Sequence, residues 1–318
     1  MKIFSLDEIK AVLPSVDLMA EIEHGFVAYS QGRSVVPPVG ELILEDPPGD
    51  VHIKYGYLKG DAYYVIKIAS GFYGNVAMGL PSSNGMMLMF SQKTGQPVAA
   101  MLDEGYLTDV RTAVAGAIAA KYLAPTKVER IGIVGTGMQA KLQLEYLMPI
   151  TDCRDVVVWG RSTEKCATYR EHVEALGFNV IATTDADEVL RTCNLIVTTT
   201  PAESPLLKNV DLLQPGTHIT AMGSDTHTKQ ELAADLLAKA DLVVADSIPQ
   251  CLERGEIHQA LKVDAIKESD LVELGAVIVS ANADGIGRSN DEQITISDLT
   301  GVAVQDIQIT KAVYEAKN

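Results

Sequence analysis

The spacing of apolar residues predicts helices first, and strands after them, in the N-terminal third of the chain. Apolar side chains recur at helical spacing through residues 6–31, and Pro14 is expected to divide this stretch into two helices. Residues 35–38 contain two prolines and are expected to be extended. Short apolar runs between proline and glycine turns then predict a sheet of neighbouring strands. The expected strands are 41–44, 51–57, 63–69, 86–90 and 97–102, with turns at 47–50, 59–61 and 93–95.

The remainder of the chain alternates between strand and helix patterns. An alanine-rich helix is expected over residues 107–123, before Pro125, as a bridge between two domains. The strands expected after it are 131–134, 156–159, 179–182, 195–199, 218–222 and 242–245. Such alternation is typical of an α/β fold with a parallel, doubly wound sheet. A final helix is expected at 302–316, and we expect it to pack back on the first domain.

A glycine-containing turn joins the first strand of the alternating region to its helix, with the spacing of a dinucleotide-binding fingerprint. Gly135 and Gly137 would allow a tight turn and the close approach of a pyrophosphate, and Ala140 stands in the position of the third glycine. The following helix would direct its first N–H groups at the phosphates. The expected cofactor-binding residues of this turn are Gly135, Thr136, Gly137, Met138 and Gln139. The alternative is a glycine turn that holds no ligand.

Composition and charge narrow the class of protein. The chain has 318 residues, 47% of them hydrophobic, and a net charge of −16, which disfavours nucleic acid and anionic membranes as partners. It has no run of about 18 apolar residues, and Asp7 and Glu8 come too early for a signal peptide. The four cysteines lack metal-ligand spacing. We therefore expect two domains in a cytoplasmic protein with reduced thiols and no metal.

The residues around the second strand of the alternating region bear on the choice between NAD and NADP. Asp155 lies about 20 residues after the glycine turn, but it precedes its strand and so lies at the wrong end. Gly160, Arg161 and Ser162 follow the strand and offer a cation and a hydroxyl group. An arginine at this place accommodates a 2′-phosphate. We expect Arg161 and Ser162 to bind NADPH, with NADH as the alternative cofactor and a solvated Arg161 as the alternative role.

Two further strands end in candidate ligand-binding residues at the same edge of the expected sheet. Thr200 and Pro201 follow one strand, and Met222 and Gly223 end or follow the next. Ligands bind at the carboxyl ends of such strands, so we expect these four residues to contact the cofactor. Asp225 comes directly afterwards and is a candidate proton donor beside a nicotinamide. The alternative is that Asp225 caps the helix expected next along the chain.

Six short motifs occur together over nearly the whole length of the chain. They are YVIK at 64–67, GLPSSNG at 79–85, LTDVRTA at 107–113, GIVGTGMQA at 132–140, GSD with a following lysine and Glu-Leu at 223–232, and GRS at 287–289. In content and order they resemble the ornithine cyclodeaminase/μ-crystallin family. The resemblance implies a homodimer in which residues 1–112 and 300–318 form an α+β substrate-binding and dimerisation domain. Residues 113–299 would form an inserted Rossmann domain.

The resemblance also implies roles for individual residues. Lys67 and Arg111 match the cations that hold the carboxylate of a small α-imino or α-amino acid, and the planar fork of a guanidinium suits a carboxylate. Asp225 matches the family's acid/base residue, and Ser82 stands where a threonine near the nicotinamide is common. We expect Asp225 and Lys67 to take part in catalysis. The alternative for either cation is an ion pair with a protein carboxylate.

Two departures from the family's pattern bear on the substrate. Some members carry an arginine after the proline of a Val-Pro segment, where this chain has Val39. Ornithine cyclodeaminases use an acidic residue upstream of the lysine to receive the distal amine, where this chain has Lys54. Lys54 would repel an ornithine ammonium by about 4 kcal/mol at roughly 4 Å. We expect Lys54 to bind a carboxylate instead, and the alternative is a Lys54 that points outward from its strand.

These expectations together favour a reductase. It would transfer hydride from NAD(P)H to the C=N carbon of a cyclic α-imino acid such as Δ1-pyrroline-2-carboxylate, giving proline. Lys67 and Arg111 would orient the substrate, and Asp225 would manage the proton at nitrogen. The alternatives are an ornithine or lysine cyclodeaminase that releases ammonia, an alanine dehydrogenase, and a non-enzymatic carrier that binds NADPH.

Overall fold

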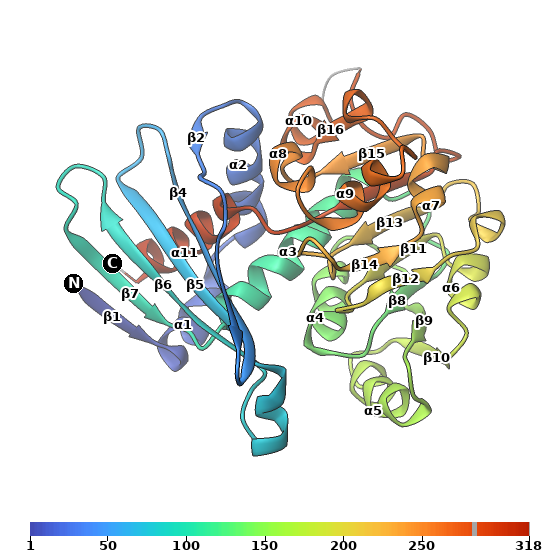
Figure 1. Cartoon of the computed structure of the whole chain (residues 1–318), viewed down its shortest axis with the longest axis horizontal. Coiled ribbons are helices and arrows are strands. Elements are labelled where there is room, and N and C mark those ends of the chain that lie inside the picture. The colour runs from blue at the N-terminus through green and yellow to red at the C-terminus, as the bar shows by residue number, and fades with distance from the viewer. Residues whose placement is uncertain (282–284, 318) are drawn as a thin grey trace. The chain divides into compact units, whose positions relative to one another are not determined.

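The chain divides into two compact units in the computed structural model, which describes residues 1–281 and 285–317. Unit 1 comprises Met1–Arg111 and Val302–Asn318, and unit 2 comprises Thr112–Gly301. Figure 1 follows the chain from the blue strands of unit 1 through the green and yellow strands of unit 2 to the red helix that returns to unit 1. Unit 2 is therefore inserted between two segments of unit 1. The separate roles expected for the two domains stay a prediction.

Unit 1 is built on a seven-stranded sheet in the order β1–β7–β6–β5–β4–β2, with β3 paired to β4. Strand β1 runs parallel to β7, and the other pairs are antiparallel. The strands are β1 (Lys2–Ser5), β2 (Ser34–Val35), β3 (Gly40–Glu45), β4 (Pro48–Leu58), β5 (Tyr63–Gly71), β6 (Ser83–Ser91) and β7 (Pro97–Leu102). The apolar residues of alternate positions, such as Val65, Met87 and Met101, form the buried face.

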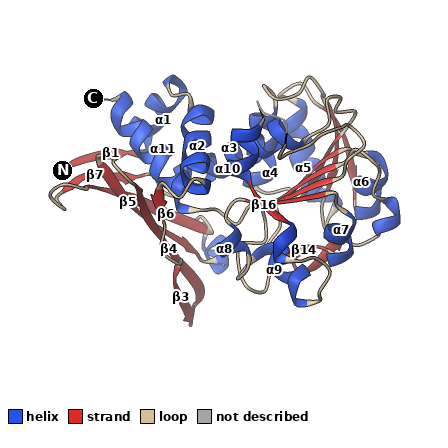
Figure 2. Ribbon diagram, turned by 90° about the horizontal axis from the view of Figure 1, so that it is seen from above, coloured by secondary structure: helices blue, strands red, loops and turns tan. Residues whose placement is uncertain are grey.

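Three helices cover the buried face of this sheet (Figure 2). They are α1 (Leu6–Val12), α2 (Leu18–Ser30) and α11 (Ala303–Ala316). Pro14 lies in a short 3₁₀ turn, η1 (Leu13–Ser15), so the expected division into two helices is confirmed. Helix α11 packs on α2, β4, β5 and β6, which confirms that the last helix returns to the first part of the chain. A second 3₁₀ segment, η2 (Tyr73–Met78), precedes β6, and α3 (Tyr106–Leu123) runs from unit 1 into unit 2.

Unit 2 contains an eight-stranded sheet in the order β10–β9–β8–β11–β13–β17–β15–β16, with every neighbouring pair parallel. This confirms the doubly wound α/β fold. The strand order reverses between β8 and β11, where ligands bind in such sheets. The strands are β8 (Ile131–Val134), β9 (Asp155–Trp159), β10 (Asn179–Thr183), β11 (Leu195–Thr198), β13 (His218–Ala221), β15 (Leu242–Ala245), β16 (Leu271–Glu273) and β17 (Thr295–Asp298). A small two-stranded sheet pairs β12 (Glu203–Leu207) with β14 (Gln230–Leu232).

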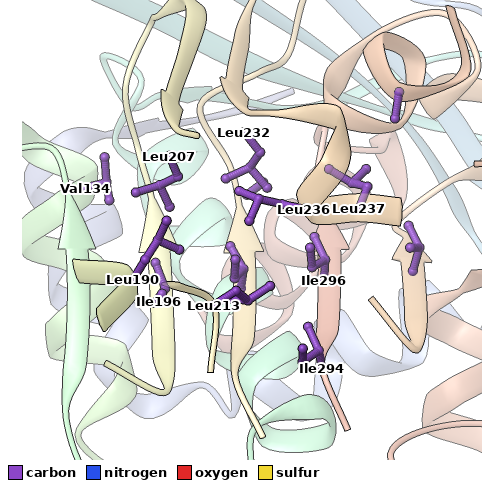
Figure 3. Close-up of a cluster of buried hydrophobic side chains, with 14 of the residues drawn as sticks. Val134, Leu190, Ile196, Leu207, Leu213, Leu232, Leu236, Leu237, Ile294 and Ile296 are labelled. Atoms are coloured by element: carbon purple, nitrogen blue, oxygen red, sulfur yellow. The ribbon is translucent and has the colours of Figure 1, made fainter. Parts of the chain in front are cut away.

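Apolar side chains cover both faces of the parallel sheet. On one face, Ile196 and Ile296 pack with residues of α6 and α7 such as Leu190 and Leu236 (Figure 3). On the other face, Leu195 and neighbouring strand residues pack with α4 and α5. The remaining helices are α4 (Met138–Leu147), α5 (Thr163–Glu174), α6 (Ala186–Thr192), η3 (Val210–Leu212), α7 (Ala234–Lys239), α8 (Ile248–Cys251), α9 (Gly255–Lys262), η4 (Glu268–Asp270) and α10 (Leu274–Ser280).

Some local expectations are wrong. Strand β4 already begins at Pro48, so the expected turn at 47–50 is confined to residues 46 and 47. No helix follows Asp225 directly; β14 comes next among the described residues, and α7 begins only at Ala234 with Ala233 as its N-cap. Strands β1 and β17 were not expected, because β1 is short and β17 alternates polar with apolar residues. In the described part of the chain, no helix is long and apolar enough to cross a membrane.

Candidate active site

The turn after β8 is shaped to approach a phosphate group. Gly135 has φ +126, and a Cβ atom there would lie 2.5 Å from Thr199 Oγ1, so the position requires glycine. Its N–H donates to the Trp159 carbonyl at 2.9 Å, which fixes the turn against β9. Gly137 is the N-cap of α4, no side chain of the described residues caps the helix, and the space beside its Cα is open. The first N–H groups of α4 can therefore receive an anion.

The other predicted residues of this turn lie around the same helix start. Thr136 packs against the end of β9, because a Cβ atom on Gly160 would lie 2.8 Å from Thr136 Cγ2. Met138 is 62% exposed at the first position of α4, and Gln139 is half-buried. Ala140 is fully buried, as expected for the position where helix and strand pack closely.

The tip of β9 presents the residues expected to select the cofactor. Arg161 is exposed, and Ser162 is the N-cap of α5, where its hydroxyl accepts from the Lys165 N–H at 3.3 Å. Asp155 is the first residue of β9, so it lies at the opposite end of the strand, as expected. The tip therefore offers a cation and no carboxylate within residues 160–163.

The carboxyl ends of β11 and β13 are joined through a buried glutamate. The Thr200 N–H and hydroxyl donate to Glu231 Oε1 at 2.5 and 2.8 Å. The Gly223 N–H donates to Glu231 Oε2 at 2.8 Å. Two predicted cofactor residues, Thr200 and Gly223, are thus brought together. Pro201 is exposed beside them, and Met222 accepts a hydrogen bond from Gln143 Nε2 at 2.8 Å.

Asp225 lies in the loop that follows β13. Its Oδ1 pairs with Lys229 Nζ at 2.6 Å, and its side chain is 38% exposed. The backbone carbonyl of Asp225 accepts from Arg254 at 3.2 Å. The helix-capping alternative is wrong because the next helix begins well beyond it. Asp225 is therefore a carboxylate that solvent can reach, held by a neighbouring ammonium.

The cations predicted to bind the substrate meet at a buried carboxylate of unit 1. Lys67 Nζ and Arg111 Nε each lie 3.1 Å from Asp306 Oδ1, and the three side chains are between 1% and 7% exposed. Arg111 Nη1 also donates to Gln305 Oε1 at 2.9 Å. The structure thus brings Lys67 and Arg111 together and realises the alternative in which each pairs with a protein carboxylate. Asp306 balances one of the two positive charges, and the buried Asp103 carboxyl also lies near Lys67.

Lys54 joins the same buried face. It stands directly opposite Lys67 in the antiparallel register of β4 and β5, and it is 7% exposed. Directly opposite residues share a face of the sheet, so the alternative of an outward-facing Lys54 is wrong. Ser82 lies elsewhere, before β6, beyond the point where Gly71 pairs with Ser83. The structure does not bring Ser82 next to Lys67 along this ladder.

Burial changes the protonation of Lys67 within the cation cluster (Lys54, Lys67 and Arg111). Burial, together with the positive charge of Arg111, lowers the pKa of Lys67 to about 7, although Asp306 acts in the opposite direction. Burial raises the pKa of the nearby Asp103 carboxyl to about 6. An anion entering the cluster would restore the preference of Lys67 for its charged form.

Several residues of these sites escaped sequence reasoning. Asp306 and Gln305 lie in α11, which is buried along nearly its whole length, and a carboxylate inside such a helix needs a cation as partner. That signal could have marked Asp306 as the partner of a buried cation, without indicating which one. Glu231 was noticed only as part of a motif, because its short strand resembles a helix start in sequence.

The site in unit 2 defines a class of protein. A glycine turn at the reversal of the strand order, opening onto an uncapped helix, fits the pyrophosphate of a dinucleotide and identifies a Rossmann domain. The sequence model of the ornithine cyclodeaminase/mu-crystallin family matches residues 2–318. The chain therefore belongs to that family, as the motifs predicted.

Individual relatives are similar to this chain over nearly its whole length. An uncharacterised cyclodeaminase of Sinorhizobium fredii is 39% identical over 99% of this chain and 95% of its own length. A Δ1-pyrroline-2-carboxylate reductase of Bacillus cereus is 32% identical, with 94% and 92% coverage.

Solved structures give the same picture of the fold. An archaeal alanine dehydrogenase dimer with bound NAD has a TM-score of 0.90 and 34% identity, covering 99% of this chain and 95% of that one. The Δ1-pyrroline-2-carboxylate reductase of Thermococcus litoralis, in complex with NADH and L-proline, has a TM-score of 0.91 and 26% identity, with 99% and 97% coverage. The expectation of an NAD(P)H-dependent oxidoreductase is confirmed at the level of class.

Proposed function

We propose that this chain reduces the C=N bond of a cyclic α-imino acid, Δ1-pyrroline-2-carboxylate or a similar ketimine, to the cyclic amino acid. The observation that carries the proposal is the buried cation cluster, in which Lys67 and Arg111 share a single carboxylate, Asp306. A substrate carboxylate would add a further negative charge beside Lys67 and Arg111. The relatives named as Δ1-pyrroline-2-carboxylate reductases, one of them solved with NADH and L-proline, support this substrate class.

The proposed reaction adds hydride to the imine carbon and a proton to the nitrogen, so that C=N becomes CH–NH and NAD(P)H becomes NAD(P)⁺. NAD(P)H, bound at the glycine turn, supplies the hydride. Arg111 and Lys67 hold the carboxylate, and Lys54 adds positive charge on the same face, which together orient the imine carbon. The proton comes from solvent and reaches the nitrogen through Asp225, whose side chain is 38% exposed and is held in place by Lys229. The role of Ser82 near the nicotinamide stays a prediction.

NADPH is the proposed preferred cofactor, with NADH as the alternative. The support is the exposed Arg161 at the tip of β9, where a guanidinium can pair with a 2′-phosphate. The hydroxyl of Ser162 already caps α5, so its contribution would come together with the N–H groups of that helix start. The solved relatives named above contain NAD and NADH, so a direct comparison of both cofactors is needed.

A cyclodeaminase is the second candidate, because one of two relatives that are 39% identical is named an uncharacterised cyclodeaminase, while the other is named a putative dehydrogenase. Ornithine would bring a distal ammonium toward the sheet face that holds Lys54 and Lys67. Lys54 is 7% exposed, so solvent would screen its repulsion of that ammonium only weakly. This repulsion favours the reductase over the cyclodeaminase.

We also propose that the chain forms a homodimer through the uncovered face of the unit 1 sheet. Alternate residues on that face are apolar and exposed: Ile3 60%, Leu42 58%, Leu102 44%, Tyr55 38% and Met86 38%. Apolar patches of this extent are typical of protein interfaces. An archaeal relative is described as a dimer, which supports the proposal. Light scattering should give twice the chain mass, and Tyr55→Glu combined with Met86→Glu should give monomers.

The first experiment follows the nicotinamide absorbance of NADPH and NADH with Δ1-pyrroline-2-carboxylate. Rapid loss of the NADPH signal is the expected result, with proline as the product detected by chromatography. A flat trace with both cofactors would contradict the reductase. Ammonia release from ornithine in the presence of NAD, without net change in absorbance, would then favour the cyclodeaminase.

A further inference from the structure

Glu231 holds together the two strand ends that face the proposed cofactor site. It is fully buried and accepts four hydrogen bonds, one from the Thr198 hydroxyl at 2.6 Å in addition to those from Thr200 and Gly223. All four donors come from the ends of β11 and β13. Each carboxylate oxygen of Glu231 accepts two of these bonds. A glutamine would replace one oxygen with an NH₂ group, which cannot accept from the two donors that face it.

The approach of the two strand ends is unusually close. A Cβ atom on Gly223 would lie 2.1 Å from the Thr200 carbonyl oxygen and 2.5 Å from Glu231 Oε2. Only glycine leaves room for this contact. The position of Thr200 relative to Gly223 is therefore set by a backbone contact and by the carboxylate that accepts from both.

Glu256 fixes Glu231 in turn. Its Oε1 accepts from the Glu231 N–H at 2.7 Å, and its Oε2 accepts from the Leu232 N–H at 3.0 Å. Ser224, the neighbour of Asp225, also donates to Glu256 Oε1. The Glu231–Glu256 pair thus connects the predicted cofactor residues with the loop that carries Asp225. The partners of both carboxylates are backbone N–H and hydroxyl groups of unit 2.

We propose that Glu231 is a positioning residue for the dinucleotide, because its four hydrogen bonds hold Thr200 and Gly223 in the arrangement that receives the cofactor. The inference rests on the proposed NAD(P)H site and adds a residue that does not itself touch the ligand. It predicts that weakening the bonds to Glu231 lowers cofactor affinity, while the affinity for the imino acid at saturating cofactor stays the same.

The test compares Thr198→Val with Thr198→Ser in the full chain. Valine removes the hydroxyl donor to Glu231, and serine keeps it. NADPH affinity is measured by quenching of the single tryptophan, Trp159, which ends β9 beside the glycine turn. We expect Thr198→Val to weaken NADPH binding about tenfold, as for loss of one hydrogen bond to a buried charge, and Thr198→Ser to change it less than about twofold.

Glu231→Gln should weaken NADPH binding further, with kcat at saturating cofactor nearly unchanged. Melting of the ligand-free variants separates positioning from general stability. Equal NADPH affinity of Thr198→Val and Thr198→Ser, or a lower melting temperature with unchanged affinity, would overturn the positioning role. If the unmodified chain failed to bind NADPH or NADH, the proposed function would itself be wrong, which is a distinguishable outcome.

Discussion

The buried charges of unit 1 include three cations, whereas those of unit 2 are mostly carboxylates. In unit 1, Lys54 and Lys67 lie on an antiparallel sheet and Arg111 lies beside them on α3, with Asp306 as the carboxylate that Lys67 and Arg111 both contact. In unit 2, buried carboxylates such as Glu231 lie at the carboxyl edge of a parallel sheet and accept from backbone and hydroxyl groups.

The difference follows from the partners that each kind of sheet provides. In the antiparallel ladder of β4 and β5, residues 50–57 pair with 64–71. Because their backbone groups bond to one another, few of them remain to bond to a buried charged side chain. Where strands leave the parallel sheet, the N–H groups of Thr200 and Gly223 remain available, and Glu231 accepts from them. Glu231 is therefore satisfied by backbone and hydroxyl groups of its own unit, whereas Lys67 and Arg111 rely on a side-chain carboxylate, Asp306.

The largest effect is expected at Arg111. Arg111→Lys keeps the charge but removes the planar fork, and it breaks the paired geometry with Asp306 and Gln305. Losing a hydrogen bond to a charged group costs about 1.5–3 kcal/mol, so kcat/KM for the imino acid should fall by about tenfold to a hundredfold. Steady-state kinetics at saturating NADPH measure this loss.

Arg170→Lys is the matched control, because Arg170 pairs with Glu174 at 2.6 Å on the exposed surface of α5. Exposed pairs contribute little, so its kcat/KM should equal that of the unmodified chain. An equally small effect of Arg111→Lys would contradict the proposal that the cation cluster binds the substrate carboxylate.

The second prediction concerns the buried carboxylates of unit 2, because the protonation of Glu256 should change the free energy of unfolding with pH. Burial, with the charge of Glu231 nearby, raises the pKa of Glu256 from 4.5 to about 7. The folded chain then binds more protons than the unfolded chain between these values, so this group makes the free energy of unfolding decrease by about 3 kcal/mol as pH rises from 4.5 to 7. Urea unfolding at several pH values should give a flatter dependence for Glu256→Gln. An unchanged slope would show that another group binds these protons.

Lys67 should have the opposite effect at higher pH, because it should make the free energy of unfolding increase as pH rises. Its pKa falls from 10.5 to about 7 on folding, so the unfolded chain binds the extra proton and stability rises across this interval. For activity the sign reverses, because carboxylate binding needs the charged ammonium. We expect kcat/KM to fall about tenfold per pH unit above 7. Lys67→Arg should abolish this decline, since a guanidinium stays protonated, and persistence of the decline would assign it to another group.

The smallest effect is expected at Arg161, where solvent screens the charge. Arg161→Ala should lower the ratio of NADPH to NADH affinity by about tenfold or less and leave NADH binding unchanged. Tryptophan quenching with each cofactor measures both affinities. An equal loss for NADPH and NADH would contradict recognition of the 2′-phosphate.

Periodicity and turn chemistry were sufficient to predict most of the framework. The strand at 131–134, the helix after Gly137 and the division at Pro14 all depend on short-range pattern, and they are found as expected. The prediction that Lys67 and Arg111 hold one substrate carboxylate came from a resemblance, and the structure adds that both lie against the same oxygen of Asp306.

Long-range partners could not be predicted from the sequence. Asp306 is separated from Lys67 by the whole of unit 2, and no local pattern indicates which distant cation a buried carboxylate will meet. Glu231 was missed for another reason: its three-residue strand is defined by pairing with β12, and neither strand is apolar enough to be recognised alone.

The insertion of unit 2 into unit 1 has a consequence for the order of assembly during synthesis. Residues 112–301 are contiguous, so this unit can fold as soon as it has been translated, whereas the sheet that carries Lys67 must wait for α11. Until α11 has been translated, Lys67 and Arg111 lack the Asp306 carboxylate that pairs with them in the folded chain. The cation cluster is therefore enclosed only after α11 has been translated, and under the proposed function a nascent chain would acquire its cofactor domain before it could hold an imino acid.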